Sequence, residues 1–257
     1  MPGRVIVFAY GVLCYVVFLG TFLYAIGFIG NLAVPKSMDS GRKGPLPEAL
    51  LIDALLLGLF AVQHSVMARQ WFKRAWTRVI PEPAERSAYV LFSSLLLLLL
   101  FWQWRPIGGV VWNVEHGAGR AALHAVYAAG WLTVLGSTFL IHHFDLFGLR
   151  QVYAYLRGRP YAAIGFRTPG LYRYVWASSV PEVAPGLLGT PTMTAAHLLF
   201  AVATTGCILV AIPFEEPDLI RFFGNQYERY KQETPMLLPL PSGRGKSPKL
   251  IIDEGVR

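Results

Sequence analysis

Charged side chains are scarce in this sequence. Asp, Glu, Lys and Arg make up 15% of its 257 residues, whereas 54% of the residues are hydrophobic. Soluble domains usually carry about 25% charged residues. A soluble bundle of buried helices would need a larger polar shell than this chain can supply. The composition therefore favours an integral membrane protein.

Cysteine is almost absent, and several common catalytic motifs are missing. The two cysteines, Cys14 and Cys207, lie in apolar runs without metal-ligand spacing, which excludes a disulfide framework. The sequence has no Walker-type loop, no glycine-rich dinucleotide loop after a strand, no Gly-x-Ser-x-Gly and no His-Glu-x-x-His. These absences argue against the common nucleotide-binding, hydrolase and zinc-protease classes.

Long apolar runs are abundant instead. Five of them reach about 18 residues or more, enough to cross a hydrocarbon core of ~30 Å at 1.5 Å per residue. They cover residues 5–30, 50–67, 87–104, 121–141 and 195–213. The first run is too long for the core of a signal peptide and lacks a small-residue cleavage site, so it predicts a retained helix. We expect an all-α polytopic membrane helix bundle with five to six transmembrane helices and a cytoplasmic C-terminal amphipathic helix.

The positive charges are distributed unevenly between the loops. If residues 176–189 provide a sixth crossing, 18 of the 23 Lys and Arg residues lie on one side of the membrane and 5 on the other; five crossings give 11 and 12. The positive-inside rule then places both termini in the cytoplasm. The basic net charge of +8 is explained by topology and lipid contact, and does not indicate nucleic-acid binding.

Four polar segments lie at membrane depth or at its edge, where polar residues are costly and suggest function. They are residues 63–65, 142–145, 145–174 and 214–235. Three of them also have a structural interpretation: a helix-end cluster bonded to a neighbour at 63–65, an interfacial aromatic stretch at 145–174, and a solvated helix start at 214–235. Tyr227 and Tyr230, spaced i and i+3, are expected to share a helix face. We expect no metal site at His142 and His143, because adjacent helical residues diverge by about 100°.

Four stretches carry a resemblance to a known family. They read QHSVMAR at 63–69, HHFDLFGLRQVY at 142–153, FRTPGLYRYV at 166–175 and EEPDLIRFFGNQYERYKQETPMLLP at 215–239. With these, the chain resembles the membrane methyltransferases related to isoprenylcysteine carboxyl methyltransferase and nurim, most of all the bacterial branch that methylates methanethiol. The resemblance extends to about Pro239. We therefore expect a membrane domain over residues 1–239 and a disordered cytoplasmic tail over residues 240–257.

The resemblance implies S-adenosylmethionine as the methyl donor and a small thiol, methanethiol, as the acceptor, with dimethyl sulfide as the product. A sulfonium donor that also carries an ammonium and a carboxylate suits an aromatic, mixed-charge pocket. The residues expected to bind it are Tyr172, Arg173, Tyr174, Glu215, Glu216, Tyr227 and Tyr230. His64 and His142 are the candidate catalytic bases that deprotonate the thiol.

Three other functions stay open at this point. The chain could methylate another lipophilic thiol or a prenyl-cysteine, because such substrates share the same chemistry. It could be a non-catalytic membrane protein of the nurim kind that binds lipid or partners. A transporter would need paired intramembrane charges and broken helices in matching halves of the chain, which the sequence does not show outside residues 176–189.

Residues 176–189 depart from the family pattern. The family continues with Arg-His-Pro-Leu-Tyr and an apolar helix, whereas this chain has Pro181, Glu182 and Pro185. One back-translation of the segment, shifted by one base, encodes Gly-His-Pro-Leu-Tyr-Leu-Arg-Trp-Leu-Leu-Ala-Phe-Trp. We therefore hypothesise a local frameshift that closes before Thr190. Two prolines and a charge predict a broken or irregular membrane arm here, and impaired methyltransferase activity.

Overall fold

The computed structural model describes residues 2–42, 44–162 and 179–234 of the chain. Within these ranges, five helices are long and apolar enough to cross a membrane. They are α1 (Pro2–Gly30), α2 (Leu46–Ala68), the unit formed by η1 (Glu82–Ala84) and α4 (Glu85–Gln103), α5 (Gly117–Ile141) and α9 (Ala195–Phe223). This confirms the prediction of an all-α membrane bundle and of its five apolar spans.

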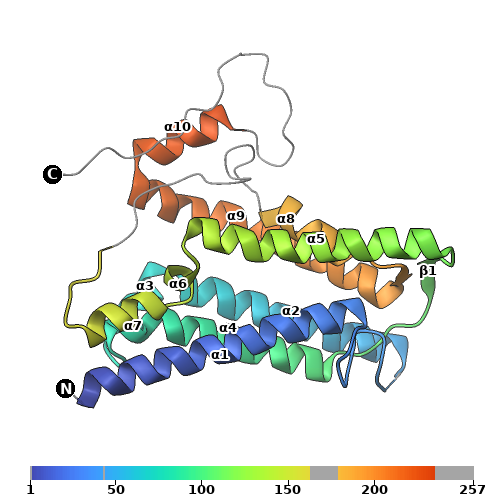
Figure 1. Cartoon of the computed structure of the whole chain (residues 1–257), viewed down its shortest axis with the longest axis horizontal. Helices are drawn as coiled ribbons and strands as arrows, with labels where there is room; N and C mark the ends of the chain where they lie inside the picture. Colours follow the sequence, from blue (N-terminus) through green and yellow to red (C-terminus); the bar gives the residue numbers. More distant parts are fainter. Residues whose placement is uncertain (1, 43, 163–178, 235–257) are drawn as a thin grey trace.

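Short elements close the two ends of the bundle. Figure 1 places α3 (Gln70–Trp76), α6 (His143–Leu146), α7 (Leu149–Leu156) and α10 (Asn225–Glu233) at the same end as the start of α1. We call this the site end. At the opposite end, β1 (Val110–Asn113) pairs antiparallel with β2 (Thr192–Thr194), with Trp112 opposite Met193. We call this the hairpin end.

Helix α8 (Ser179–Leu188) occupies most of the segment that departs from the family. Its ten residues rise about 15 Å, roughly half of a hydrocarbon core. The expectation of a broken or irregular arm was wrong over these residues, because the helix continues through Pro185. Pro181 lies in the first turn, where a missing N–H costs little. Residues 176–178 lie outside the described ranges.

Packing explains why α8 forms despite its poor helix propensity. It lies between α5 and α9, and a Cβ atom added at Gly130 of α5 would stand 2.3 Å from the backbone nitrogen of Gly186. A Cβ at Gly189 would stand 2.7 Å from the backbone nitrogen of Tyr127. Glycines thus let the two backbones touch, as small residues commonly do between membrane helices. Tertiary packing, rather than local propensity, stabilises this short helix.

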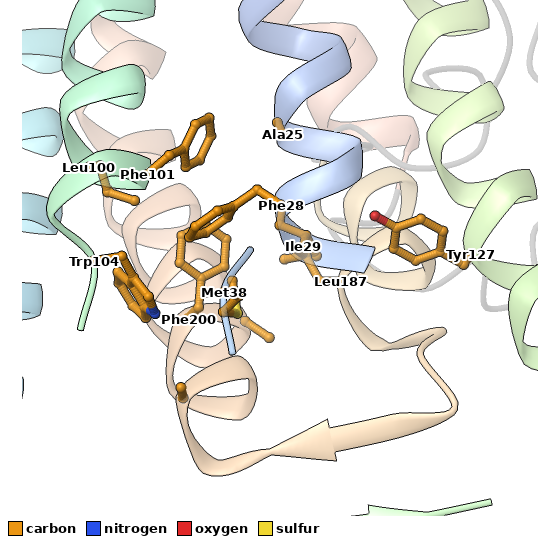
Figure 2. Close-up of a cluster of buried hydrophobic side chains, with 12 residues drawn as sticks. Ala25, Phe28, Ile29, Met38, Leu100, Phe101, Trp104, Tyr127, Leu187 and Phe200 are labelled. Carbon is orange, nitrogen blue, oxygen red and sulfur yellow. The ribbon is translucent and has the colours of Figure 1, made fainter. Parts of the chain in front are cut away.

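The buried core lies toward the hairpin end. Figure 2 shows side chains from α1, α4, α5, α8, α9 and the loop after α1 meeting there. Phe28, Trp104 and Met38 are fully buried, and the Tyr127 hydroxyl donates to the carbonyl of Ile26. This cluster joins α8 to the rest of the bundle, since Leu187 is one of its buried members.

The loop after α1 is tied to the hairpin end by polar contacts. Asn31 donates to the Asp39 carboxylate over 2.7 Å, and the Thr194 hydroxyl donates to the other Asp39 oxygen. The Lys36 ammonium donates to the Trp104 carbonyl at the end of α4, over 3.0 Å. Inside α2, the fully buried Asp53 accepts from the backbone N–H of Arg105 over 2.9 Å. Charged groups at this end therefore terminate helices and anchor loops.

Candidate functional site

Three of the predicted donor-binding residues, Glu216, Tyr227 and Tyr230, lie at the site end, where α9 turns into α10 (Figure 1). Gly224 makes the corner with φ 56° and ψ −136°, a conformation that side-chain-bearing residues rarely adopt. The turn brings Lys231 of α10 back to Glu216 of α9, and the two form an ion pair. A carboxylate and an ammonium from two helices are thereby held together at the site end.

Tyr227 and Tyr230 lie on one face of α10, as their spacing predicts. Both side chains are buried, and their ring centroids are 6.2 Å apart at an interplanar angle of 52°. Lys231 is four residues after Tyr227, so the ammonium and the rings belong to neighbouring positions of one helix surface. Of the predicted donor-binding set, the structure places Glu216, Tyr227 and Tyr230 at the corner between α9 and α10, with Glu216 paired to Lys231 and the two rings beside each other.

Four other predicted residues are not placed by the structure. Tyr172, Arg173 and Tyr174 lie outside the described residues, and the side chain of Glu215 does too. Their part in a donor site stays a prediction.

His64 belongs to a polar seam between α2 and α4. The Tyr89 hydroxyl lies 2.8 Å from its Nε2 and 2.9 Å from its Nδ1, and the imidazole stacks on Phe60 at 5.4 Å. One turn away on the same seam, Ser93 donates to the Gln63 amide oxygen over 3.4 Å. This arrangement agrees with the structural interpretation of residues 63–65 as a helix-end cluster bonded to a neighbour. It also holds the His64 imidazole with the Tyr89 hydroxyl against its edge.

His142 ends α5 in a left-handed conformation, with φ 93° and ψ 75°. The buried partner in the pair is His143, which the sequence analysis did not select. Its Nε2 lies 2.9 Å from the Tyr15 hydroxyl and its Nδ1 lies 2.8 Å from the Thr138 hydroxyl. Thr138 donates its own hydrogen to the Leu135 carbonyl, so its oxygen accepts from Nδ1–H and Tyr15 donates to Nε2.

The structure therefore gives His143 a neutral, fully bonded ring. Its ring stacks on Phe139 with the planes 2° apart and the centroids at 4.2 Å. Burial lowers the pKa of His143 below its ordinary value, because desolvation disfavours the imidazolium. Among the described residues, no group of three or more His, Cys, Asp or Glu side chains could hold a metal ion. His143 acts as a packing residue that joins α1 to the end of α5.

A second polar cluster holds the chain just before residues 163–178. The Tyr161 hydroxyl donates to both Asp145 carboxylate oxygens, over 2.9 and 3.0 Å, and Gln151 donates to the Asp145 carbonyl over 3.1 Å. Arg150 pairs with the same carboxylate at 3.4 Å. Burial and the hydrogen bond to the Asp145 carboxylate raise the pKa of Tyr161. Sequence reasoning singled out this stretch but not Tyr161, because no spacing rule links residues sixteen positions apart.

Two close contacts connect this polar cluster to the start of α4. Arg86 at the start of α4 donates through Nε to the Leu146 carbonyl over 3.1 Å. Gly148 has φ 85°, and a Cβ there would stand 2.5 Å from the Ser87 hydroxyl. The DLFGLRQVY stretch is therefore a fixed corner at the site end, and its glycine is required both by the turn and by the approach to α4.

A cavity of about 660 Å³ opens between α2 and α9 near the same end. Its lining is almost entirely apolar, apart from Arg69 and Ser65. The Arg69 guanidinium donates to the Phe214 carbonyl and lies 3.8 Å from the Asp218 carboxylate. The lining residues are Ala61, Ser65, Val66, Arg69, Trp71, Ala203, Gly206, Cys207, Val210, Ala211 and Phe214.

Comparison with known proteins identifies the family. The chain is 54% identical to the methanethiol S-methyltransferase of Crocosphaera subtropica, over 92% of this chain and 93% of that protein. It is 52% identical to the methanethiol S-methyltransferase of Mycobacterium tuberculosis, over 93% of this chain and 98% of that protein. This chain belongs to the methanethiol S-methyltransferase family.

The relationship confirms the resemblance and extends to nurim. The nurim of Xenopus laevis is 28% identical over 80% of this chain and 79% of that protein. No family model and no solved structure matches the chain. The roles of individual residues in this methanethiol S-methyltransferase family member therefore rest on its own geometry.

Proposed function

We propose that this chain transfers a methyl group from S-adenosylmethionine to methanethiol, forming dimethyl sulfide, at the site end of the membrane bundle. The observation that carries the proposal is the 54% identity to a methanethiol S-methyltransferase over nearly the whole chain. The α9–α10 corner supports it, because it gathers ionic and aromatic groups at one membrane edge.

We propose that the donor binds to the face of α10 that is turned toward the end of α9. Glu216 offers a carboxylate to an ammonium, Lys231 offers an ammonium to a carboxylate, and the rings of Tyr227 and Tyr230 suit a sulfonium. The side chains present therefore fit a donor that carries all three charged groups. Tyr172, Arg173, Tyr174 and Glu215 are proposed to complete this surface.

When bound, S-adenosylmethionine would supply a methyl group on a positively charged sulfur, and the thiolate of the acceptor would take this methyl group as its bond to the donor sulfur breaks. The chain contributes a base and a dry, oriented site. His64 or His142 takes the thiol proton, as a neutral imidazole can. The Tyr89 hydroxyl holds the edge of the His64 ring, which makes His64 the better-oriented of the two.

A direct test is the release of dimethyl sulfide, measured in the headspace above membranes that contain the chain, methanethiol and S-adenosylmethionine. Because residues 176–189 lack the family motif, we expect weak turnover from the chain as it stands. Replacing that segment with the reading-frame-restored sequence, with Arg before His-Pro, is expected to raise turnover. Equal turnover by both versions would show that the missing motif is not needed.

The second candidate is a non-catalytic membrane protein of the nurim kind, favoured by the departure at residues 176–189 and by the similarity to nurim. Calorimetry separates the two. An S-adenosylmethionine-binding chain supports the enzyme, and a chain that binds no donor even after restoration supports the nurim-like alternative.

The proposed location is a bacterial inner membrane with both termini in the cytoplasm. The start of α1 and helix α10 lie at the same end of the bundle, in keeping with this topology (Figure 1). Reporter fusions after Arg120 are expected to read periplasmic, and fusions after Arg167 or at the C-terminus cytoplasmic. A periplasmic C-terminus would overturn this orientation.

A further inference from the structure

The cavity between α2 and α9 is too large for a one-carbon thiol. Methanethiol has two heavy atoms and occupies on the order of 60 Å³, twice the share of a water molecule in the liquid. The cavity holds about 660 Å³, a size typical of sites for much larger ligands. An apolar hollow of this size on a membrane helix bundle needs a different occupant.

The length of the cavity matches one leaflet of a bilayer. Its lining runs along α9 from Ala203 to Phe214, about 16 Å at 1.5 Å per residue. Along α2 it runs from Ala61 to Arg69, about 12 Å. Half of a hydrocarbon core is about 15 Å. The length of the hollow therefore equals the depth of one leaflet, which is the depth that an acyl chain occupies.

The mouth of the cavity has the chemistry of a headgroup site. Arg69 stands there beside Trp71, whose side chain is 58% exposed, and Trp is typical of the membrane–water interface. Lys73 and Arg74 follow in the last turn of α3, and residues 54–81 contain no Asp or Glu. The acid within reach is Asp218, 3.8 Å from Arg69 with both side chains partly exposed.

Such a long, partly exposed ion pair contributes little, and the hydrogen bond to the Phe214 carbonyl comes from one nitrogen, Nη1, of the guanidinium. The remaining N–H groups can bind a phosphate, for which arginine offers parallel hydrogen bonds. We propose that this cavity holds one acyl chain of an anionic phospholipid from the leaflet at the site end, with the lipid phosphate on Arg69. Arg69 is the last residue of the QHSVMAR stretch, which would then bind a lipid phosphate in addition to providing the candidate base His64. The bound lipid seals the gap between α2 and α9 beside the donor corner.

Native mass spectrometry of the full chain, released from vesicles of equal phosphatidylglycerol and phosphatidylcholine, tests the proposal. We expect one retained phospholipid per chain, with phosphatidylglycerol enriched at least fivefold. Soluble glycerol phosphate added in excess should not displace it, because the acyl chain carries most of the buried surface. Absence of a retained lipid, equal retention of the two lipids, or displacement by glycerol phosphate would each overturn the proposal.

Gly206→Leu tests the acyl-chain position. A Cβ at Gly206 meets nothing within 4 Å, so a leucine can enter the cavity without displacing the backbone. We expect at least a tenfold loss of the retained lipid. Gly136→Leu on α5 is the matched control, because its Cβ also meets nothing within 4 Å, and it should retain the lipid. Equal retention by both variants contradicts the proposed position.

Arg69→Gln tests the headgroup. We expect it to abolish the preference for phosphatidylglycerol, and Arg69→Lys to restore part of it. Arg157→Gln, at the end of α7 on the same side of the bundle, should leave the preference unchanged. A preference that survives in Arg69→Gln excludes this arginine as the phosphate ligand.

Cys207 provides an independent readout in the unmodified chain. It lines the cavity and is exposed, whereas Cys14 is fully buried. Alkylation by N-ethylmaleimide should therefore fall on Cys207. We expect added phosphatidylglycerol to slow this labelling at least fivefold in lipid-depleted detergent. Labelling that is insensitive to the lipid would show that the acyl chain does not enter the cavity.

Discussion

The two ends of the helix bundle differ in the kind of side-chain contact that they contain. At the hairpin end, Phe28, Trp104 and Met38 are fully buried in an apolar cluster (Figure 2). Loops at this end are anchored by hydrogen bonds such as that from Thr194 to Asp39. The site end carries ion pairs between described residues, which join Arg69 to Asp218, Arg150 to Asp145 and Lys231 to Glu216.

This difference suggests that the hairpin end mainly stabilises the fold, whereas the site end mainly provides groups for binding. Close packing near the hairpin end fixes where α8 and α9 lie, and this determines where α9 emerges at the site end. Exposed ion pairs add little stability. At the site end, the pair of Glu216 and Lys231 belongs to the surface that we propose for the charged donor. Substitutions near the hairpin end should therefore change stability, and substitutions at the site end should change binding.

The largest stability effect is expected from Gly130→Leu. A side chain at this position would meet the backbone of Gly186 at 2.3 Å and separate α5 from α8. Overpacking typically costs about 1–3 kcal/mol and more when a backbone must move, so we expect the variant to fail to accumulate or to unfold at a much lower temperature. Thermal unfolding in detergent measures this, with Gly136→Leu as the control. Similar unfolding temperatures would show that the α5–α8 contact is not needed for stability.

Glu216→Gln should show the opposite pattern. Removing the carboxylate is expected to weaken S-adenosylmethionine binding roughly tenfold, or ~1.4 kcal/mol, and to change the unfolding free energy by less than about 1 kcal/mol. Calorimetry and thermal unfolding measure the two quantities. The exchange Glu216→Lys with Lys231→Glu keeps an ion pair but reverses its direction. Normal donor binding by the exchanged chain would show that the pair is structural only.

The smallest effect is a pH dependence of stability from His143. Its folded-state pKa lies below the ordinary value of 6.5, so the unfolded chain binds more protons as the pH falls through that value. The contribution of neutral His143 to the free energy of unfolding is therefore fully present above about pH 6.5, and it decreases as the pH falls below that value. His143→Phe keeps a ring against Phe139 but cannot titrate, so its unfolding temperature should depend less on pH between 7 and 5. Parallel pH profiles for the two chains would contradict this.

Composition and periodicity predicted the membrane class, the five apolar spans and the shared face of Tyr227 and Tyr230, because each follows from local sequence alone. They did not predict α8, since its stability comes from contact of Gly186 with Gly130, 56 positions earlier in the chain. They did not predict that His143 is the buried member of the histidine pair, because adjacent histidines cannot be told apart without knowing which one faces Tyr15.

The cavity between α2 and α9 was equally beyond sequence reasoning. Its lining comes from two apolar runs that look alike on both faces, and nothing in their periodicity marks Gly206 or Ala61 as facing a hollow. Interactions between distant segments decide such features, and they appear only when the helices are placed side by side.

The central claim is methyl transfer to methanethiol at the site end, and the release of dimethyl sulfide tests it most directly. Membranes that contain the reading-frame-restored chain, supplied with methanethiol and S-adenosylmethionine, are expected to produce dimethyl sulfide at least 100-fold faster than membranes with the chain as it stands. A Glu216→Gln version of the restored chain serves as the control with reduced donor binding. No dimethyl sulfide from the well-folded restored chain would contradict the account.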